Sequence, residues 1–329
     1  MARVGFVYHP LFLEHETGPF HPESPERLAA IVSRLRGTGL IDELEPIDPV
    51  PADLSWIETV HDPSYVGSVR GACPAEGIAH LDPDTVVSPK SFDAARLAVG
   101  AVLSAVDAVM EGRVQRAFCA VRPPGHHALP GRAMGFCLFN NVAIGARYAQ
   151  RKHGLSHVLI VDFDVHHGNG TQAAFYDDPS VLFFSTHQFP HYPGTGRAEE
   201  RGAGDGMGTT INAPLPPGAG GADILGALDS LLAPAVESFR PEIVLVSAGF
   251  DGHAEDPLAR FELTEEDYGE ITKRIVSLSE KHAKGRVVSV LEGGYNLSAL
   301  ARSVEAHIQG LMEIWRGVRS GEFGVERPG

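Results

Sequence analysis

Short apolar runs alternate with longer amphipathic segments along most of the chain. The runs are rich in β-branched residues and predict six buried strands, at residues 3–8, 117–121, 157–163, 181–185, 242–247 and 286–291. The segments between them predict helices at residues 91–111, 140–153, 222–239, 264–284 and 297–315, and Thr264 is the expected N-cap of the fourth. Continuously apolar strands that alternate with helices indicate a parallel sheet covered on both faces.

The composition is that of a folded domain with a short tail. The 329 residues contain no internal repeat and no low-complexity linker, and α/β enzymes often use this length for one domain. No apolar run approaches the roughly 20 residues that cross a bilayer, so we expect no membrane partner. We expect one domain over residues 1–315 and a polar tail over residues 316–329.

Charge and cysteine content narrow the partners and the compartment. The net charge of −15 argues against nonspecific binding to nucleic acid, which needs a basic face. It would suit a cationic substrate, although acidic surfaces also simply keep proteins soluble. The three cysteines, Cys73, Cys119 and Cys137, form no CxxC pair, so we expect free thiols and a reducing, cytoplasmic location.

Polar and glycine-rich segments follow five of the predicted strands. They read RPPGHHA at residues 122–128, DFDVHHGN at 162–169, STH at 185–187, SAGFDGH at 247–253 and EGGYN at 292–296. The carboxyl ends of parallel strands meet at one edge of the sheet, where ligands of open α/β folds bind. We therefore expect the five segments to form a single site.

A metal centre is the best explanation of the charge after the third predicted strand. Asp164 and His166 are two residues apart, so in extended backbone they share a face, with Asp162 one step deeper. Asp251, after another strand, is the best third ligand. Three protein ligands with an open fourth position are typical of a catalytic metal, and oxygen–nitrogen ligation suits zinc, iron(II) or cobalt. Alone, an Asp-x-His pair would more simply cap a strand.

Two histidines and a tyrosine supply further chemistry at this edge. His126 and His127 follow a rigid Pro-Pro-Gly turn, in which both could hardly bind one metal, so proton transfer to a metal-bound water suits them better. Tyr295 lies in a glycine-rich turn, from which a phenol can stabilise an oxyanion. Each residue alone could equally be an ordinary loop residue.

Taken together, these segments resemble a known enzyme family. RPPGHH, GFCLFNN, DFDVHHGNGTQ, SAGFD and EGGYN, in this order, are similar to the motifs of the histone deacetylase superfamily, and residues 15–28 are similar to a signature of its class II-like and bacterial amidohydrolase members. The resemblance covers about residues 1–312. It implies an arginase/deacetylase-like three-layer α/β/α fold with a mainly parallel, roughly eight-stranded sheet, and makes residues 1–315 one deacetylase catalytic domain.

The resemblance assigns roles to residues of this chain. Asp164, His166 and Asp251 match the zinc ligands, Tyr295 the catalytic tyrosine, and His126 and His127 the tandem histidines. Asp162 matches the partner of the first histidine, and Asn169, where class I members have Asp, the partner of the second. The implied reaction is hydrolysis of an amide by a metal-activated water, with His127 as general base.

The resemblance also implies monovalent cations and a narrow substrate tunnel. An inner potassium site matches Asp162, Asp164, His166, Ser185 and Thr186, and an outer one Phe175, Asp178 and Val181. Gly135, Phe136 and Tyr192 match the tunnel walls, and Asp84 matches a rim carboxylate that accepts N–H bonds from a peptide. Tyr192 could also simply pack in its loop, and Asp84 could cap a turn.

Leu258 bears on the substrate. Polyamine-selective members of the superfamily have an acidic gate near this position, so Leu258 favours an acyl-lysine protein or peptide over an acetylated small amine. Glu255 and Asp256, close by, could still attract a polyamine. Two other classes of protein compete with a deacylase. The first is an arginase-like ureohydrolase, which the tandem histidines together with Tyr295 disfavour. The second is a non-catalytic acyl-lysine reader, which the complete set of metal ligands disfavours. A homo-oligomer is compatible with the sequence.

Overall fold

The structure, a computed structural model, describes residues 1–313. Its centre is an eight-stranded sheet in the order β2-β1-β5-β10-β9-β6-β7-β8, and every neighbouring pair is parallel. In that order the strands are Glu45–Pro46, Val4–Val7, Arg116–Cys119, Val287–Leu291, Ile243–Ala248, Val158–Asp162, Val181–Gln188 and Thr210–Leu215. The six strands predicted from apolar runs are all present, which confirms the predicted parallel α/β architecture. The predicted tail lies outside the described residues.

The two strands of this sheet that the apolar pattern did not predict are its edge strands. β2 has two residues, both exposed, and β8 is only partly buried. Each contains a proline, Pro46 or Pro214, which cannot donate a ladder hydrogen bond and is tolerated at a sheet edge. Central strands are buried on both faces and read as apolar runs, whereas edge strands need not.

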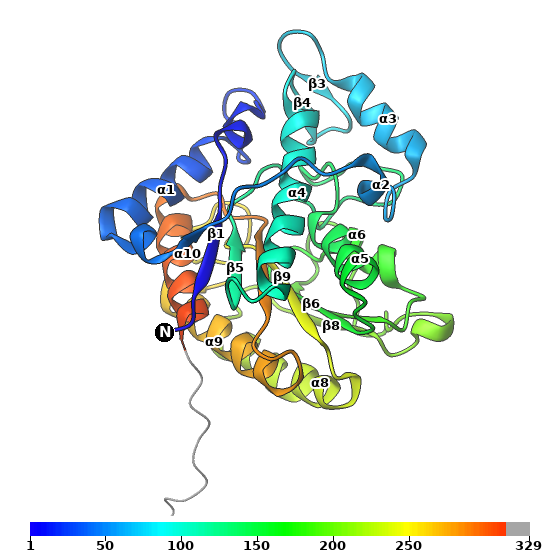
Figure 1. Cartoon of the computed structure of the whole chain (residues 1–329), viewed down its shortest axis with the longest axis vertical. Helices are drawn as coiled ribbons and strands as arrows, with labels where there is room; N and C mark the ends of the chain where they lie inside the picture. The colour runs from blue at the N-terminus through cyan, green and yellow to red at the C-terminus, as the bar shows by residue number, and fades with distance from the viewer. Residues whose placement is uncertain (314–329) are drawn as a thin grey trace, which may run out of the picture.

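Helices cover both faces of the sheet (Figure 1). On β5, Phe118 contacts His307 of α10 (Leu297–Met312), with ring centroids 5.5 Å apart. The next residue, Cys119, directs its Sγ to the carbonyl of Ala101 in α4 (Ser91–Met110). Because successive side chains of a strand point to opposite faces, α4 and α10 lie on opposite sides of the sheet. α5 (Asn141–His153) packs beside α4, and α1 (Glu26–Thr38) and α9 (Glu265–His282) pack beside α10.

A small lobe stands above the carboxyl edge of the sheet. It contains α2 (Leu54–Ile57), α3 (Pro63–Ala72) and a hairpin of β3 (Ala79–His80) and β4 (Val86–Val87), the only antiparallel strand pair among the described residues. The turn of this hairpin carries Asp84. The lobe therefore brings a residue from the first third of the chain toward the segments that follow the central strands.

The helix predicted over residues 222–239 is helical but not uniform. α7 (Gly221–Ala227) runs into a wider π-type turn at Leu228–Leu232, and α8 (Ala233–Phe239) follows. Pro234, in the first turn of α8, has no N–H to continue the regular ladder, which accounts for the wider turn. The predicted N-cap of α9 is confirmed: the Thr264 hydroxyl accepts from Asp267 N–H, and the Asp267 carboxylate accepts from Thr264 N–H.

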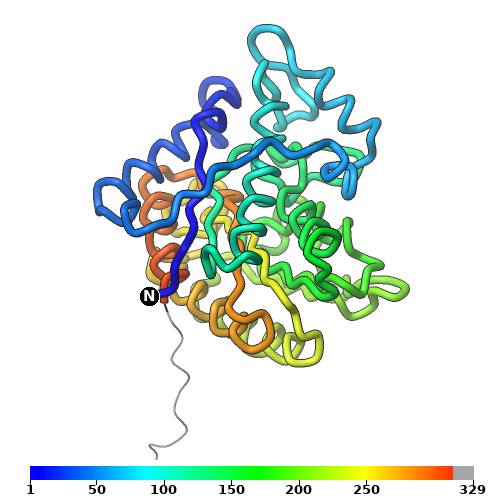
Figure 2. Tube along the Cα trace, viewed as in Figure 1, coloured from blue at the N-terminus to red at the C-terminus, as the bar shows by residue number. Residues whose placement is uncertain are grey.

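The beginning of the chain lies against the last described helix. Ala2 N–H donates to the carbonyl of Met312 at 2.8 Å, and Figure 2 shows the first strand running beside α10. All three cysteines are free thiols, as predicted. Among the helices of residues 1–313, none is long and apolar enough to cross a membrane.

Candidate active site

Two aspartates and a histidine converge at the carboxyl ends of the central strands. Asp164 and His166 follow β6, and Asp251 follows β9, its neighbour in the sheet. His166 Nδ1 lies 3.1 Å from Asp164 Oδ1 and 3.0 Å from Asp251 Oδ2. One ligand atom from each residue lies within 4.8 Å of the other two, and all three side chains are buried. The structure thus brings together the predicted zinc ligands.

Backbone N–H groups hold the two carboxylates in place. Asp164 accepts from His166 N–H on Oδ1 and from Gly293 N–H on Oδ2, both at 2.9 Å. Asp251 Oδ1 accepts from Val165 N–H at 3.1 Å. A Cβ at Gly293 would lie 2.6 Å from Asp164 Oδ2, so the carboxylates occupy space that any other residue would fill. Three strand ends, those of β6, β9 and β10, therefore share in building the cluster.

This donor set fits a zinc ion. Two carboxylate oxygens and one imidazole nitrogen are ligands that zinc accepts, and three protein ligands leave a position for substrate or water. The converging carboxylates would repel one another without a cation, since burial in a low-dielectric interior strengthens that repulsion. The chemistry of the cluster and its burial thus both favour a resident divalent cation.

The tandem histidines face the cluster from the segment after β5. His126 Nδ1 lies 2.9 Å from Asp162 Oδ2, and His127 Nδ1 lies 2.7 Å from Asn169 Oδ1. The two imidazole centroids are 4.0 Å apart, and that of His127 is 5.9 Å from the ring of His166. Both predicted partners are therefore in place, each on the Nδ1 side, so that each Nε2 is directed away from its partner.

The surroundings of the two histidines shift their pKa values in opposite directions. Burial disfavours the charged form of His126, yet the carboxylates of Asp162, Asp164 and Glu292 outweigh it and raise the pKa of His126 well above its usual value. Burial and the positive charge of neighbouring histidines lower the pKa of His127 well below its usual value. A charged His126 beside a neutral His127 is therefore the favoured pair of protonation states.

A tunnel of about 190 Å³ leads to the cluster. Its walls are formed by aromatic, apolar and polar side chains from several loops: Asp84, His127, Gly135, Phe136, His166, His191, Tyr192, Leu258 and Tyr295. The structure thus places every residue predicted to contact substrate along one cavity. Gly135 and Phe136 both have positive φ, 56° and 68°, and Phe136 N–H donates to the hydroxyl of Thr85 in the small lobe.

Tyr295 stands at the inner end of this tunnel beside the ring of Phe136, with centroids 5.8 Å apart. The guanidinium of Arg27 lies 5.1 Å from the Tyr295 ring, and Arg27 Nε donates to the carbonyl of Gly294 at 2.7 Å. Burial raises the pKa of the Tyr295 phenol well above its usual value, so the phenol keeps its proton and can donate it in a hydrogen bond.

The residues predicted to bind potassium lie on β6, on β7, at the end of α6 (Asn169–Phe175) and in the segments that follow β6 and α6. Ser185 pairs with Asp162 in the β6–β7 ladder, and Thr186 Oγ1 is buried without a hydrogen-bond partner among the described residues. At the outer position, Asp178 binds Arg147 and Ser180 through its carboxylate. Both potassium sites stay predictions.

The sequence did not predict the structural roles of three residues near the site, one of which, Asp256, it offered only as a carboxylate that could attract a polyamine. Glu292 accepts N–H bonds from Gly125 and His126 and so orients the histidine segment. Asp256 accepts the N–H of Tyr295. His191 stacks on His166, with centroids 5.1 Å apart. The position of Glu292 directly after a predicted strand, in EGGYN, could have indicated its role, whereas the other two residues lie in loops without a recognisable pattern.

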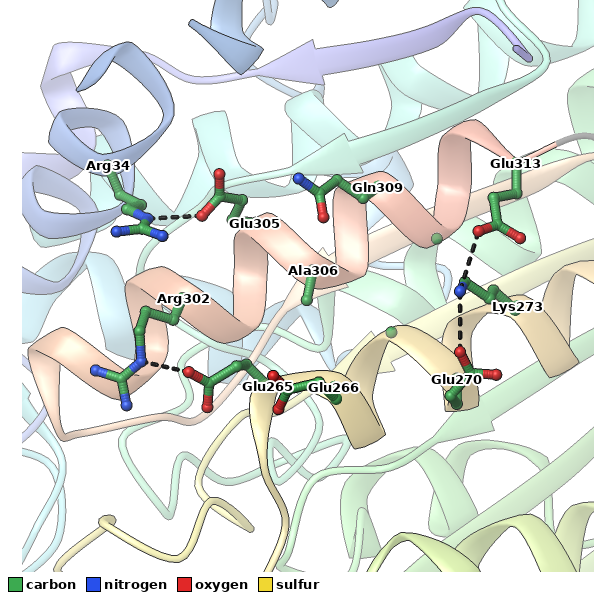
Figure 3. Close-up of a pocket in the computed structure, with 12 residues that line it drawn as sticks. Arg34, Glu265, Glu266, Glu270, Lys273, Arg302, Glu305, Ala306, Gln309 and Glu313 are labelled. Atoms are coloured by element: carbon green, nitrogen blue, oxygen red, sulfur yellow. Dashed lines mark hydrogen bonds and ion pairs between the residues drawn. The ribbon is translucent and has the colours of Figure 1, made fainter. Parts of the chain in front are cut away.

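A second groove, of about 500 Å³, lies over α9 and α10, away from the metal ligands. Most of its charged side chains form ion pairs with one another (Figure 3): Arg34 with Glu305, Arg302 with Glu265, and Lys273 with Glu270 and Glu313. Because these charges are neutralised by their partners, the groove does not direct several reactive side chains at one point as the tunnel does.

Comparison with known proteins agrees with this geometry. The family model described as histone deacetylase domain matches residues 21–311. A probable deacetylase of Archaeoglobus fulgidus is 43% identical over 89% of this chain and 82% of its own length. A histone deacetylase-like amidohydrolase of Pseudomonas aeruginosa is 38% identical over 89% of this chain and 82% of its own.

Two further relatives extend the comparison. The human polyamine deacetylase HDAC10 is 43% identical over 88% of this chain, which spans 44% of that protein. The crystal structure of the HDA15 HD domain superposes with a TM-score of 0.90 at 36% identity, covering 94% of this chain and 88% of that one. The fold is therefore the arginase/deacetylase-like α/β fold, and the chain belongs to the histone deacetylase family of hydrolases.

Proposed function

We propose that this protein is a zinc-dependent deacylase that hydrolyses the amide of Nε-acetyl-lysine, or of a related acyl-lysine, in proteins or peptides. One observation carries the proposal. A narrow tunnel with Phe136 and Tyr192 among its walls ends at a buried Asp-His-Asp cluster, two paired histidines and a tyrosine. An acyl-lysine side chain is long, slender and apolar up to its amide, and so suits such a tunnel.

The hydrogen bonds of the site assign the proton transfers. The Asn169 oxygen can only accept, so His127 carries its proton on Nδ1 and leaves Nε2 free as a base. His127 then takes a proton from the attacking water and returns it to the leaving amine. His126, held by Asp162, supplies positive charge beside it. Zinc, when bound, would polarise the amide carbonyl and acidify the water.

Tyr295, which also lines the tunnel, supplies the last group of the proposed mechanism. Its phenol stays protonated, so it can donate a hydrogen bond to the oxyanion that forms when water adds to the carbonyl. Such a donor acts in the transition state more than in the ground state, and therefore raises kcat. The products are the free amine and a carboxylic acid, and no covalent intermediate with the protein forms.

The tunnel wall favours acyl-lysine over an acetylated polyamine. Leu258 presents an apolar side chain to the cavity. Glu255 pairs with Arg302 at 3.0 Å, and Asp256 is only 7% exposed and accepts backbone N–H groups. A polyamine carries extra positive charge, but the Asp256 carboxylate is already satisfied by backbone N–H groups, and Glu255 is paired with Arg302 and does not line the tunnel. The similarity to a polyamine deacetylase nevertheless makes acetylpolyamine the second candidate substrate.

The decisive experiment compares steady-state hydrolysis of an acetyl-lysine peptide and of N8-acetylspermidine on protein whose zinc content has been measured. We expect a higher kcat/KM for the peptide. The variant Leu258→Glu should shift the preference toward the polyamine, because it adds an unpaired carboxylate to the wall. Preference of the wild type for the polyamine would refute the acyl-lysine assignment, and failure of the zinc-loaded protein to hydrolyse either substrate or a longer acyl-lysine would refute the deacylase function.

A further inference from the structure

We propose that Asp256 is a positioning residue that fixes Tyr295 and the tunnel wall at Leu258 relative to each other. The proposal rests on the proposed function for its kinetic consequences, but its geometry stands without it. Asp256 lies five residues beyond Asp251 in the chain and does not line the tunnel itself. It therefore acts through the residues that it holds.

The carboxylate of Asp256 collects three backbone N–H groups from two segments. Its Oδ2 accepts from Tyr295 N–H at 2.7 Å and from Asn296 N–H at 3.2 Å. Its Oδ1 accepts from Leu258 N–H at 3.0 Å. One side chain thus joins the segment that carries the predicted catalytic phenol to the segment that carries a tunnel wall.

An ionised carboxylate suits this position better than any other side chain of its size. Both of its oxygens accept and neither donates, so it can satisfy N–H groups on two sides. An asparagine can accept on one side only, because its NH₂ group would face an N–H on the other. Buried charge is tolerated when it is hydrogen-bonded in this way, and hydrogen bonds to charged groups are the strong ones.

The turn that presents Asp256 is itself anchored. Asp256 N–H donates to the carbonyl of His253, and His253 Nε2 lies 3.1 Å from Glu265 at the start of α9. Arg302 of α10 binds both Glu265 and Glu255, and Figure 3 shows the first of these contacts. The carboxylate is therefore held from behind by two helices, which lets it impose a position on Tyr295.

Loss of this carboxylate should displace the phenol without disturbing the metal ligands. Misplacing a reacting group by about 1 Å can lower a rate about 100-fold. We therefore expect Asp256→Ala to lower kcat by about 10- to 100-fold. Asp256→Asn can keep its oxygen toward Tyr295 and Asn296 and lose only Leu258, so it should retain more of kcat and mainly raise KM.

A double-mutant cycle with Tyr295→Phe tests whether Asp256 acts through the phenol. Groups that act as one unit are non-additive. In the Tyr295→Phe background, Asp256→Ala should therefore change kcat far less than in the wild type. Equal fold-changes in the two backgrounds would overturn the proposal. Glu262→Gln is the matched control: it removes an exposed carboxylate from the same loop that takes no part in these contacts, and should leave kcat on the peptide unchanged.

Crystal structures of zinc-loaded wild type and Asp256→Ala supply a readout that needs no activity. We expect the Tyr295 hydroxyl and the Leu258 backbone to move while Asp164 and Asp251 stay in place. An unmoved Tyr295 would overturn the positioning role even if the enzyme proved to be an acyl-lysine deacylase. Conversely, a wild type inactive on every amide would overturn the proposed function, while a displaced Tyr295 would still support the role of Asp256.

Discussion

Gly249 offers the sharpest test of the metal site. It is the first residue after β9, and a Cβ built there would lie 2.5 Å from Asp164 Cβ and closer still to its carboxylate. Optimal carbon–carbon contacts are about 3.5–4.0 Å, so in Gly249→Ala the Asp164 side chain must move by about 1 Å. The φ of Gly249 is not in the left-handed region, so the backbone itself accepts alanine. The perturbation therefore acts on the ligand alone.

The magnitude follows from what metal sites tolerate. Ligand distances that depart by more than about 0.2 Å from their preferred values weaken a site, and a shift of about 1 Å exceeds that tolerance. Disturbing even the outer partners of metal ligands costs about 10- to 100-fold in affinity. We expect at least the upper end here, about 100-fold or about 2.7 kcal/mol. Overpacking should also lower the metal-free unfolding free energy by about 1–3 kcal/mol.

The assay is zinc competition against a chromogenic chelator, accompanied by urea unfolding of the metal-free protein. Gly226→Ala is the matched control, because a Cβ in that part of α7 meets nothing within 4 Å. It should leave zinc affinity unchanged and stabilise the helix by about 0.5–1 kcal/mol. If Gly249→Ala bound zinc as tightly as the wild type, the inference that Asp164 is a ligand would be refuted.

Three further predictions concern stability. Burial opposes ionisation of Glu23, yet Arg122 and Arg27 lower its pKa from 4.5 to about 2. The ionised carboxylate therefore adds about 3 kcal/mol to the free energy of unfolding above roughly pH 4.5, and this contribution is lost as the pH falls toward 2. Glu23→Gln should flatten this acid limb in urea unfolding, and an unchanged limb would contradict the assignment. Thr264→Ala should lower the free energy of unfolding by about 1 kcal/mol, because it removes the N-cap of α9, and should leave zinc affinity unchanged. Urea unfolding and zinc titration of the variant check the two parts of this prediction. Removing zinc with a chelator should lower Tm, because a ligand bound only by the native state stabilises it, and one equivalent of zinc should restore it; a Tm indifferent to both would argue against a resident metal.

Local patterns predicted the parts of the fold that are buried on both sides. β6 and β9 are continuous apolar runs because helices cover both of their faces, and such runs stand out in a sequence. β8 reads TINAPL and is only partly buried, so it lacks both a continuous apolar run and a clean alternation of apolar and polar residues. The apolar pattern did not predict α1 although this helix is amphipathic, since its first residues lie within the segment that resembles a family signature. Strands at the edge of a sheet therefore lack the continuous apolar run by which buried strands are recognised in a sequence.

Some residues of the candidate site could likewise be predicted from local sequence, and others could not. Asp164, His166 and Asp251 follow apolar strands, so the rule that ligands bind at carboxyl ends leads to them. Asp256 could not be found like that, since its role depends on where Tyr295, 39 residues later, comes to lie. The sequence left a different role open for Asp256, that of a carboxylate that could attract a polyamine. Only the three-dimensional contacts show that this charge is already satisfied by the backbone.

The order of strands has a consequence for how such an enzyme can change. The groups predicted to perform the chemistry follow β5, β10, β9 and β6, four adjacent central strands, whereas the other residues of the tunnel wall come from separate loops. Selection can therefore vary the walls, and with them the acyl group or amine that is accepted, while the reactive centre is inherited intact. Asp256 marks the limit of this independence, because the loop that carries Leu258 also holds Tyr295. A new specificity introduced through that loop would have to keep one carboxylate in order not to lose the rate.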